Sequence, residues 1–411
     1  MKIYKPPPDK SITIRALLLG AIADGRTTVE NPLFCADTAA AINCLRALGV
    51  KLLVSKKRVS IEGRGLKGLT RPRRPLNAAE AGTVARLLAG ILAGQDFPAQ
   101  VTGAASLRRR PMVRVAAPLK LMGAGIKLHC GTLPLNSRPA ALKGITYALP
   151  IPSAQVKSAI LLAGLYAKGR TSITEPAVSR DHTERLLARF GARIARSGHT
   201  IRLRPGPLKR AKVLVPGDMS AAAPFITAAL LSGRALLVKN VGLNPSRLGF
   251  IKTLKKMGAS LQITSRTSGP EPAGDIRVRP SKLKAVRVSA AEVPTMIDEI
   301  PLLAVLAAAA EGKTVISGAG ELRYKESNRI KTTLGLLATL GAAARHTNGT
   351  LEITGPCSFR GGTANPLSDH RLAMAAAAAG TRTAARLNIK NPGCVSKSYP
   401  GFFTDLKRVF C

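Results

Sequence analysis

Carboxylates stand beside cations near the start of two apolar stretches in the last third of the chain. Asp298 and Glu299 lie inside MIDEIPLLAVLAAAA, where an ionised group is costly unless it is paired or functional. Further on, RYKESNR places three cations around Glu326. On one continuous helix, Lys325 and Arg329 would be four residues apart and would share a face. A solvated charged surface is the alternative, but the flanking stretches are apolar, so we expect acid–base chemistry here.

Similar polar clusters precede the other apolar stretches. In DKSITIR, Lys10 and Arg15 flank a predicted helix start with Ser11 as its N-cap, although a solvated helix end would look the same. Glycine at position 82 would let a backbone N–H approach a ligand closely. The remaining candidates near such starts, or shortly after a strand or helix, are Arg110, Ser153, Gln155, Ser179, Asp369, Arg371 and Lys397.

The apolar stretches that must position these residues recur six times. They begin near Ser11, Gly82, Ser153, Ser220, Ile297 and Ser368, at spacings of 71, 71, 67, 77 and 71 residues. Most are followed by a glycine turn and a strand-like segment, as in KGRTSITE and EGKTVISG. Chance similarity of Ala/Leu-rich helices is the alternative, and five nearly equal spacings argue against it. We interpret the chain as a repeat protein.

A second marker keeps the same period. Segments ending in a large apolar residue and glycine recur as LRALGVKLLV, LKLMGAGIKL, LARFGARIAR, LKKMGASLQI and LATLGAAARH. Each is typical of a helix closed by a C-terminal glycine and followed by a strand. Six units of about 70 residues, each with two helices and several strands, predict two domains of three units. Helix N-termini gathered on one face of each domain would attract anions.

The charge of the chain is unusual. The 411 residues contain 63 Lys and Arg against 22 Asp and Glu, a formal net charge of +41. A polyanionic partner such as nucleic acid is one explanation, and a compositional drift over the whole surface is another. Basic residues are scattered, with dense runs only at 71–74 and 108–110, and aromatic residues make up 3% of the chain, with no tryptophan. Drift is therefore favoured, and nucleic acid is disfavoured as a partner.

Cysteine usage and hydropathy exclude several classes. The six cysteines are far apart and have no histidine at ligand spacing, so we expect neither a zinc site nor a disulfide framework. We found no glycine-rich dinucleotide loop and predict no metal and no cofactor. The longest apolar run, 302–310, is too short to cross a bilayer, and the amino terminus is unlike a secretory signal. A cytoplasmic protein without membrane contact is expected.

Taken together, the motifs resemble the 5-enolpyruvylshikimate-3-phosphate synthase family. The matching segments, in the family's order, are DKSITIR, AGTVAR, RRRP, SAQVKSA, SRDHTER, MIDEIP, RYKESNR, SDHRLAM and SKSYPGFF. The resemblance implies an α/β (α+β) fold of two similar domains, each an inside-out α/β barrel of three βαβαββ units, with a cleft between them. We expect one domain at residues 9–215 and the other at 1–8 plus 216–411.

The resemblance also implies roles. The substrates would be 3-phosphoshikimate and phosphoenolpyruvate, and the protein would be a monomer. Asp298 would be the base facing the 5-hydroxyl, Glu326 the acid–base group near the enol carbon, and Lys10 a further catalytic group in contact with phosphoenolpyruvate. The positions that match contacts to 3-phosphoshikimate are Lys10, Ser11, Arg15, Ser153, Ala154, Gln155, Ser179 and Lys325. Those that match the phosphoenolpyruvate cradle are Gly82, Arg110, Gln155, Arg329, Arg371 and Lys397.

The chain departs from the family pattern at a few positions. Pro8 replaces a glycine, Glu80 stands where Asn is frequent, and Ala154 lacks a hydroxyl that many members direct at the shikimate phosphate. Two rival functions remain. One is a UDP-N-acetylglucosamine enolpyruvyl transferase, which resembles this architecture but uses a loop cysteine where this chain has SLRRRPM. The other is a basic nucleic-acid-binding repeat protein, which would not explain carboxylates at apolar helix starts.

Overall fold

A computed structural model describes residues 1–267 and 270–410, which form two compact units. The first unit comprises Pro8–Val215, and the second comprises Met1–Pro7 with Pro216–Cys411. Pro8 belongs to the first unit, one residue earlier than the expected boundary. The amino terminus joins the second unit because β1 (Lys2–Tyr4) pairs in parallel with β15 (Leu236–Gly242), and because the Tyr4 ring stacks on Phe225 at a centroid distance of 3.7 Å.

The first unit contains three small sheets. The first has the order β13-β2-β4-β3, with β14 also pairing β2, and consists of β2 (Ala23–Glu30), β3 (Lys51–Ser55), β4 (Arg58–Arg64), β13 (Leu208–Lys209) and β14 (Lys212–Leu214). The second, β5-β6-β8-β7, consists of β5 (Leu76–Asn77), β6 (Ala99–Thr102), β7 (Gly125–His129) and β8 (Thr132–Arg138). The third, β11-β12-β10-β9, consists of β9 (Thr146–Ala148), β10 (Thr171–Thr174), β11 (Ile194–Ser197) and β12 (Thr200–Leu203).

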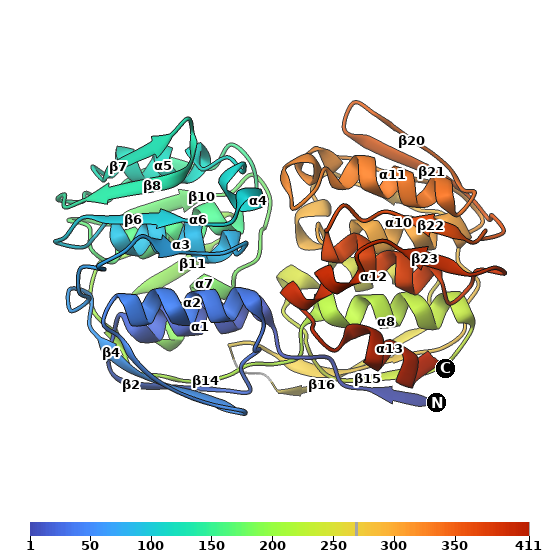
Figure 1. The fold of residues 1–411 in the computed structure, drawn as a ribbon, viewed down its shortest axis with the longest axis horizontal. Helices are drawn as coiled ribbons and strands as arrows, with labels where there is room; N and C mark the ends of the chain where they lie inside the picture. Colours follow the sequence, from blue (N-terminus) through green and yellow to red (C-terminus); the bar gives the residue numbers. More distant parts are fainter. Residues whose placement is uncertain (268–269, 411) are drawn as a thin grey trace. The chain divides into compact units, whose positions relative to one another are not determined.

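Three apolar helices fill the centre of the first unit (Figure 1). These are α1 (Lys10–Ala21), α3 (Gly82–Leu92) and α6 (Ala154–Gly164), and most of their residues are buried. Helices α3 and α6 approach closely at Gly90, where a Cβ would lie 2.3 Å from the Ala159 carbonyl oxygen. The other helices are α2 (Ala36–Ala47), α4 (Ala105–Arg108), α5 (Val113–Leu121) and α7 (His182–Arg189).

The second unit repeats this plan. Its sheets have the orders β1-β15-β17-β16, β18-β19-β21-β20 and β22-β23. Their further strands are β16 (Leu261–Thr267), β17 (Ala273–Val278), β18 (Arg287–Val288), β19 (Gly312–Ile316), β20 (Ala343–Thr347), β21 (Thr350–Gly355), β22 (Gly362–Ala364) and β23 (Leu387–Ile389).

The helices of the second unit are α8 (Met219–Ser232), α9 (Gly249–Lys256), α10 (Ile300–Ala309), α11 (Arg329–Thr339), α12 (His370–Ala379) and α13 (Phe402–Phe410). Short 3₁₀ turns accompany them: η1 (Pro245–Arg247), η2 (Val293–Thr295), η3 (Ala319–Tyr324) and η4 (Pro392–Lys397).

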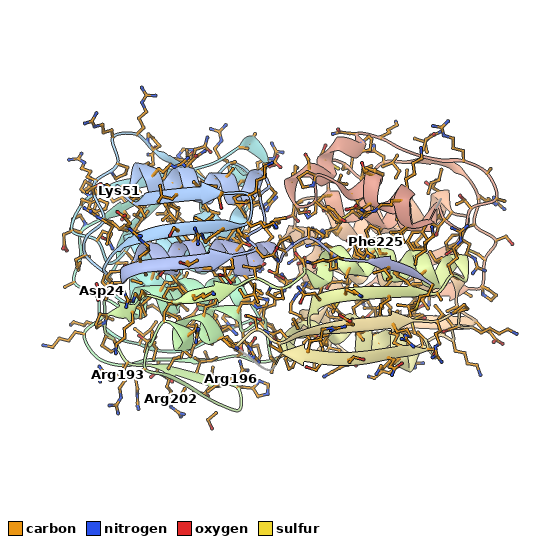
Figure 2. The ribbon with its side chains drawn as sticks, turned by 90° about the horizontal axis from the view of Figure 1, so that it is seen from below. Asp24, Lys51, Arg193, Arg196, Arg202 and Phe225 are labelled. Atoms are coloured by element: carbon orange, nitrogen blue, oxygen red, sulfur yellow. The ribbon has the colours of Figure 1, made fainter. Side chains whose placement is uncertain are left out.

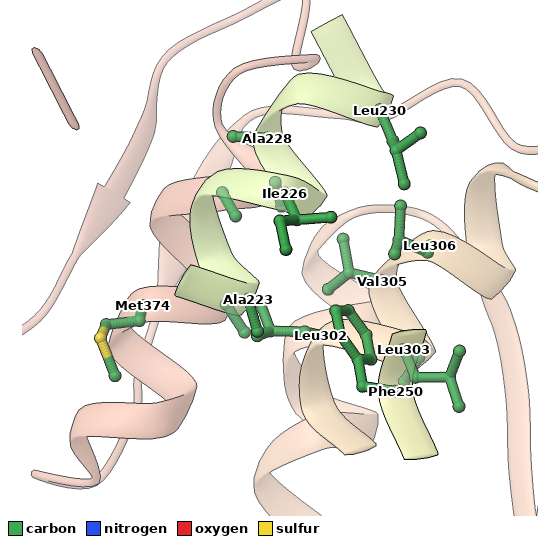
Figure 3. Packing of buried hydrophobic residues seen from close by; sticks show 14 of the residues in the cluster. Ala223, Ile226, Ala228, Leu230, Phe250, Leu302, Leu303, Val305, Leu306 and Met374 are labelled. Carbon is green, nitrogen blue, oxygen red and sulfur yellow. The ribbon is translucent and has the colours of Figure 1, made fainter. Parts of the chain in front are cut away.

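Helices α8, α10 and α12 form the centre of the second unit, and Figure 3 shows their packing. Ile226 of α8, Val305 of α10 and Phe250 of α9 are fully buried there. Because α10 is apolar on every side, it can be stable only where neighbours cover it completely. Its buried position agrees with that requirement.

The six-fold repeat is confirmed. In the second sheet of the first unit, β5, α3, β6, α5, β7 and β8 follow one another as βαβαββ, with β5 parallel to β6 and a β7–β8 hairpin. The repeat that contains α1 takes its first strand from residues 208–214, which come at the end of the first unit in the sequence. The sixth copy has β22, α12, β23 and α13, and no hairpin follows them among residues 1–267 and 270–410.

The expected helix-closing glycines are also confirmed. Gly49, Gly123, Gly191, Gly258 and Gly341 all have positive φ, between 81° and 94°, and each follows one of the outer helices α2, α5, α7, α9 and α11. A side chain in this left-handed region would cost about 1 kcal/mol, so glycine ends the helix and turns the chain into the hairpin that follows. None of the described helices combines the length and the apolar character needed to cross a bilayer.

Candidate active site

In the first unit, Arg15 ties the start of α1 to α6 and α7. Its side chain is buried, Nε donates to Thr183 Oγ1 at 2.7 Å, and Nη2 donates to Ser158 Oγ at 3.4 Å. Ser158 Oγ donates in turn to the Ala154 carbonyl at 2.5 Å. Arg15 also donates to the carbonyl of Ser11 at 3.1 Å. The predicted residues Ser11, Arg15 and Ala154 are therefore brought together.

The start of α1 differs from the prediction in one respect. The N-cap is Asp9, whose side chain accepts from Ile12 N at 2.8 Å, and Ser11 is the second residue of the helix. The expected Ser11 cap is wrong because the helix begins at Lys10, two residues earlier than a Ser11 cap would place its start. Lys10 forms an ion pair with Asp37 of α2 at 2.7 Å, and both side chains are largely buried. Asp37 had no motif that would have identified it.

A second network links α3 with α6. Arg86 Nη1 donates to Gln155 Oε1 at 2.8 Å, and Gln155 Nε2 donates to Thr83 Oγ1 at 3.0 Å. A Cβ at Gly82 would lie 2.5 Å from Arg86 Nη1 and 3.4 Å from Arg110 Nη1. Glycine therefore leaves room for two guanidinium groups. The Gly82 N–H donates to the Glu80 carbonyl at 3.0 Å. The expected role of this N–H in facing a ligand did not take that bond into account.

The hydroxyl groups of Ser153 and Ser179 both form hydrogen bonds with nearby residues. Ser153 caps α6 by accepting from Val156 N at 3.4 Å. The Ser179 hydroxyl donates to Glu175 Oε2, and its backbone N–H donates to the same oxygen at 3.2 Å. Helix α7 begins after it, with Asp181 at the N-cap position but no side-chain cap bond.

Beneath Ser179 lies a fully buried cation. Lys157 Nζ is 3.0 Å from Glu175 Oε1, 2.7 Å from Glu184 Oε1 and 3.4 Å from the Ser179 carbonyl. Arg196 Nη1 adds a contact to Glu175 at 3.1 Å. Burial raises the pKa of Glu184, against the opposing effect of Lys157. This cluster fixes the backbone and the hydroxyl of Ser179.

In the second unit, Arg329 gathers three carboxylates. Nη1 donates to Asp298 Oδ1 at 2.8 Å, Nη2 to Glu326 Oε2 at 2.5 Å, and Nε to Asp369 Oδ2 at 2.8 Å. The Arg329 side chain is 1% exposed, whereas Asp298 and Glu326 are 15% and 26% exposed. Burial opposes the charge of Arg329, but Asp369, Glu326 and Asp298 outweigh it and raise the pKa of Arg329. The two predicted catalytic carboxylates are thus fixed on one guanidinium.

The expected helical pairing of Lys325 with Arg329 is wrong. Lys325 is extended at the end of η3, and α11 begins only at Arg329, after Asn328 caps it by accepting from Lys331 N at 3.2 Å. Lys325 nevertheless reaches the same partner, because its Nζ lies 3.9 Å from Asp298 Oδ1. A turn, rather than a shared helix face, brings the cations together.

The start of α12 collects the remaining predicted residues. Asp369 is its N-cap and accepts from Arg371 N at 2.9 Å. Arg371 Nη1 donates to the Ser220 carbonyl at the start of α8 at 3.1 Å. Lys397, at the end of η4, donates to the Ser368 carbonyl at 3.1 Å. Arg371 and Lys397 therefore both lie at the N-terminus of α12.

A buried group that supports Arg371 was only partly anticipated. Glu299 is fully buried, accepts from the Ser220 hydroxyl, and is 3.1 Å from Arg247 Nη2. The sequence marks Glu299 as a carboxylate in an apolar segment, but no motif predicts its partner Arg247 or its bond to Ser220. Lys157 gives the same signal, a single charge inside the apolar stretch SAQVKSAILLAGLYA, but it was not predicted as a buried charge.

The chemistry available to the two units differs. The first unit offers cations, hydroxyls and amides at the starts of α1, α3 and α6, which suit anionic and hydroxylated ligands. The second unit adds carboxylates beside cations, which can exchange protons. Within the described part of the chain, no three His, Cys, Asp or Glu side chains are grouped so that they could hold a metal ion.

The two units share one plan, in which repeats surround a core of apolar helices and charged residues lie at the helix starts. The family model for EPSP synthase (3-phosphoshikimate 1-carboxyvinyltransferase) matches residues 2–406. The chain is 47% identical over 402 residues to the 3-phosphoshikimate 1-carboxyvinyltransferase of Desulforudis audaxviator, covering 96% of this chain and 94% of the relative. The protein belongs to the EPSP synthase family.

Solved structures agree. The EPSP synthase from Acinetobacter baumannii aligns with a TM-score of 0.87 and 41% identity, covering 99% of this chain and 95% of that one. The enolpyruvyl transferase NikO from Streptomyces tendae has a TM-score of 0.79 at 19% identity, which indicates a shared fold. The expected fold class is thereby confirmed.

Proposed function

We propose that the protein transfers the enolpyruvyl group of phosphoenolpyruvate to the 5-hydroxyl of 3-phosphoshikimate and releases phosphate. The observation that carries the proposal is the arrangement around Arg329, where Asp298 and Glu326 are both fixed within 2.8 Å of one guanidinium. Family membership and the names of the relatives support the choice of substrates.

The reaction needs three proton transfers, one to carbon, one from the hydroxyl and one back from carbon. Protonation of the methylene carbon makes C2 of phosphoenolpyruvate electrophilic, and the 5-hydroxyl attacks C2 while a base takes its proton. The tetrahedral intermediate then loses a proton from the methyl carbon and expels phosphate. We assign Asp298 as the base for the hydroxyl. Glu326 is the acid–base group at the methylene carbon, with Lys10 as a further catalytic group. These steps balance without a cofactor.

The anionic groups of the substrates require cations with fixed geometry. Arg110, Arg371 and Lys397 suit phosphoenolpyruvate because guanidinium and ammonium groups form charge-assisted hydrogen bonds worth about 1.5–3 kcal/mol each. We assign Gly82, Gln155 and Arg329 to the same ligand. The proposed contacts to 3-phosphoshikimate come from Lys10, Ser11, Arg15, Ser153, Ala154, Gln155, Ser179 and Lys325.

Arg329 serves best as an organiser in this scheme. Each of its three guanidinium nitrogens donates to one of Asp298, Glu326 and Asp369, so its charge orients the acids as well as attracting phosphoenolpyruvate. Lys325, which is 30% exposed, is more accessible to a ligand. We also propose that the protein acts as a monomer in the cytoplasm.

Phosphate release from the purified protein tests the proposal. We expect release only when phosphoenolpyruvate and 3-phosphoshikimate are both present, and a weaker response to both substrates in Lys10→Ala. Replacing 3-phosphoshikimate with UDP-N-acetylglucosamine should give no phosphate. Binding of both ligands without any turnover would refute the enzymatic assignment, and turnover of the UDP-sugar would favour the sister transferase.

A further inference from the structure

A surface pocket in the first unit is separate from the residues assigned above. It has a volume of about 480 Å³ and lies between segment 71–75 and the sheet β5-β6-β8-β7. The dense basic run at 71–74, which the proposed function does not use, forms one side of it.

The strand directions place this pocket away from the candidate active site. Strands β5 and β6 are parallel, so segment 71–75 and Pro98, which precede them, lie at the same end of the sheet. Strand β8 is antiparallel to β6 and ends there at Arg138, opposite Gly125 where β7 begins. Gly82 and Arg110, by contrast, follow the far ends of β5 and β6. The two sites therefore lie at opposite ends of the same strands.

The pocket is lined by cations without acids. Its lining includes Arg71, Arg73, Arg74, Lys127 and Arg138, and it includes no Asp or Glu. None of these five cations forms an ion pair with a carboxylate within residues 1–267 and 270–410. Elsewhere on this unit, exposed cations do find acids, as in the pair of Lys67 with Asp96 at 2.7 Å. Like charges gathered in one hollow repel one another, and a bound anion would remove that repulsion.

The floor of the pocket can add hydrogen bonds. Gln100, Asn136 and Lys127 are paired across β6, β8 and β7, while their neighbours Ala99 and Ser137 point into the core, so these three side chains face outward. Gln100 Nε2 donates to Asn136 Oδ1 at 2.8 Å. Amide groups of this kind can donate to the oxygens of a phosphate bound in the pocket.

The lining also indicates what the ligand lacks. No aromatic side chain is among the lining residues, so a nucleobase would find no stacking surface. Pro72 and Pro75 restrict the backbone around Arg73 and Arg74, so less conformational freedom is lost when these side chains bind. The volume suits a small ligand rather than a long polymer.

We propose that this pocket binds a short chain of phosphates, either inorganic or the phosphate tail of a nucleotide, through Arg71, Arg73, Arg74, Lys127 and Arg138. Guanidinium groups are well matched to phosphate because two N–H groups can face two oxygens. The proposal is independent of the enolpyruvyl transfer reaction, since it uses none of the residues assigned to that reaction.

Calorimetric titration of the full chain with inorganic tripolyphosphate, at low salt and without magnesium, tests the proposal. The variant Arg73→Gln/Arg74→Gln should bind at least about 10-fold more weakly than the wild type. The control Arg193→Gln/Arg202→Gln removes the same charge from the exposed outer face of β11-β12, where Figure 2 shows Arg193 and Arg202 pointing outward, and should change the affinity by less than about 2-fold. Both variants should retain phosphate release, because neither changes an assigned active-site residue.

Two further ligands identify the source of the phosphates. ATP should bind within about 3-fold of tripolyphosphate if phosphates alone are recognised, and a much tighter ATP complex would overturn that selectivity. Equal weakening in the control variant would mean that binding follows diffuse surface charge, and the pocket proposal would fail. The proposal would also fail if a single-stranded oligonucleotide displaced tripolyphosphate from the wild type and bound the Arg73→Gln/Arg74→Gln variant more weakly. Nucleic acid would then be the ligand.

Discussion

Each unit contains a buried cation that contacts two or more carboxylates, but the two clusters fix different groups. In the first unit, Lys157 lies between Glu175 and Glu184, and Glu175 grips the Ser179 hydroxyl. In the second unit, Arg329 holds Asp298, Glu326 and Asp369. The first cluster presents a neutral hydroxyl, whereas the second presents partly exposed acids.

This difference follows from the geometry of the two cations. An ammonium group is a compact point charge, so Lys157 can be enclosed completely with its acids behind Ser179. A guanidinium has donors on three sides in one plane, so Arg329 can spread three acids, two of which reach solvent. We infer that the first cluster positions a substrate contact and the second positions the proton-transfer groups.

The largest expected effect separates these roles by kinetics. Asp298→Asn should lower kcat by roughly 10²–10⁴-fold, because an amide cannot accept the hydroxyl proton. Ser179→Ala should mainly raise KM for 3-phosphoshikimate. Steady-state phosphate release measures both constants. As a control, Asp275→Asn, in β17 and paired with Arg266, should leave kcat nearly unchanged. A loss of kcat in Ser179→Ala equal to that in Asp298→Asn would contradict the division of roles.

Removing Lys157 or Arg329 should strongly destabilise the unit that contains it. Lys157→Met and Arg329→Met would leave two and three buried or half-buried carboxylates without their central cation, at a cost of about 3–5 kcal/mol each. Urea denaturation measures the loss, and Arg329→Met should show the larger one. The exposed Arg345, paired with Glu352, provides the control, because Arg345→Met should cost less than about 1 kcal/mol. Equal stability of wild type and Arg329→Met would show that the acids do not depend on this cation.

The two acids beside Lys157 should behave differently. Glu175→Gln weakens the hold on Ser179 and should raise KM for 3-phosphoshikimate while lowering stability by about 1–3 kcal/mol. Glu184 contacts Lys157 at 2.7 Å, whereas Ser179 is bonded to Glu175. Glu184→Gln keeps the bonds between Glu175 and Ser179 and should therefore leave KM for 3-phosphoshikimate nearly unchanged. Steady-state kinetics and urea unfolding of both variants test this difference. A larger effect on KM in Glu184→Gln than in Glu175→Gln would contradict it.

The smallest expected effect concerns pH and lies next to the acid-bearing segment. Lys256 and the Ser289 backbone lower the pKa of Glu292 to about 2, from an ordinary value of 4.5. A lowered pKa stabilises the folded state above pH 4.5, and this contribution is lost as the pH falls towards 2. Because Glu292 is about one-third exposed, Glu292→Gln should cost only about 1 kcal/mol at pH 7. Urea unfolding at pH 7 and pH 3.5 should show this difference shrinking, and a constant difference would exclude the linkage.

Much of the architecture could be predicted from local sequence patterns. The six apolar stretches predicted the helices α1, α3, α6, α8, α10 and α12 to within a few residues, and the glycines that close the outer helices all have positive φ. These features depend on neighbouring residues, since hydrophobic periodicity, caps and glycine turns act over a few positions. Asp369 as a cap is another feature of this kind.

The site could be predicted in its membership but not in its connections. The motifs identified Asp298, Glu326 and Arg329, yet an assumed continuous helix between Lys325 and Arg329 was wrong because Asn328 starts a new helix there. Lys157 and Glu175 were missed because they are 18 residues apart and meet only when α6 packs beside the end of β10. The partner of a buried charge depends on tertiary packing, which no local pattern contains.

The repeat, the helix starts that carry charged residues and the resemblance to one enzyme family can all be recognised in the sequence alone. The three acids on Arg329, the position of Lys157 beneath Ser179 and the acid-free pocket beside the run at 71–74 depend on the folded chain. The physical reason is range: turns and helix ends are fixed by interactions between near neighbours, whereas the balance of charge at a buried or concave site is fixed by residues that the fold brings together from distant segments.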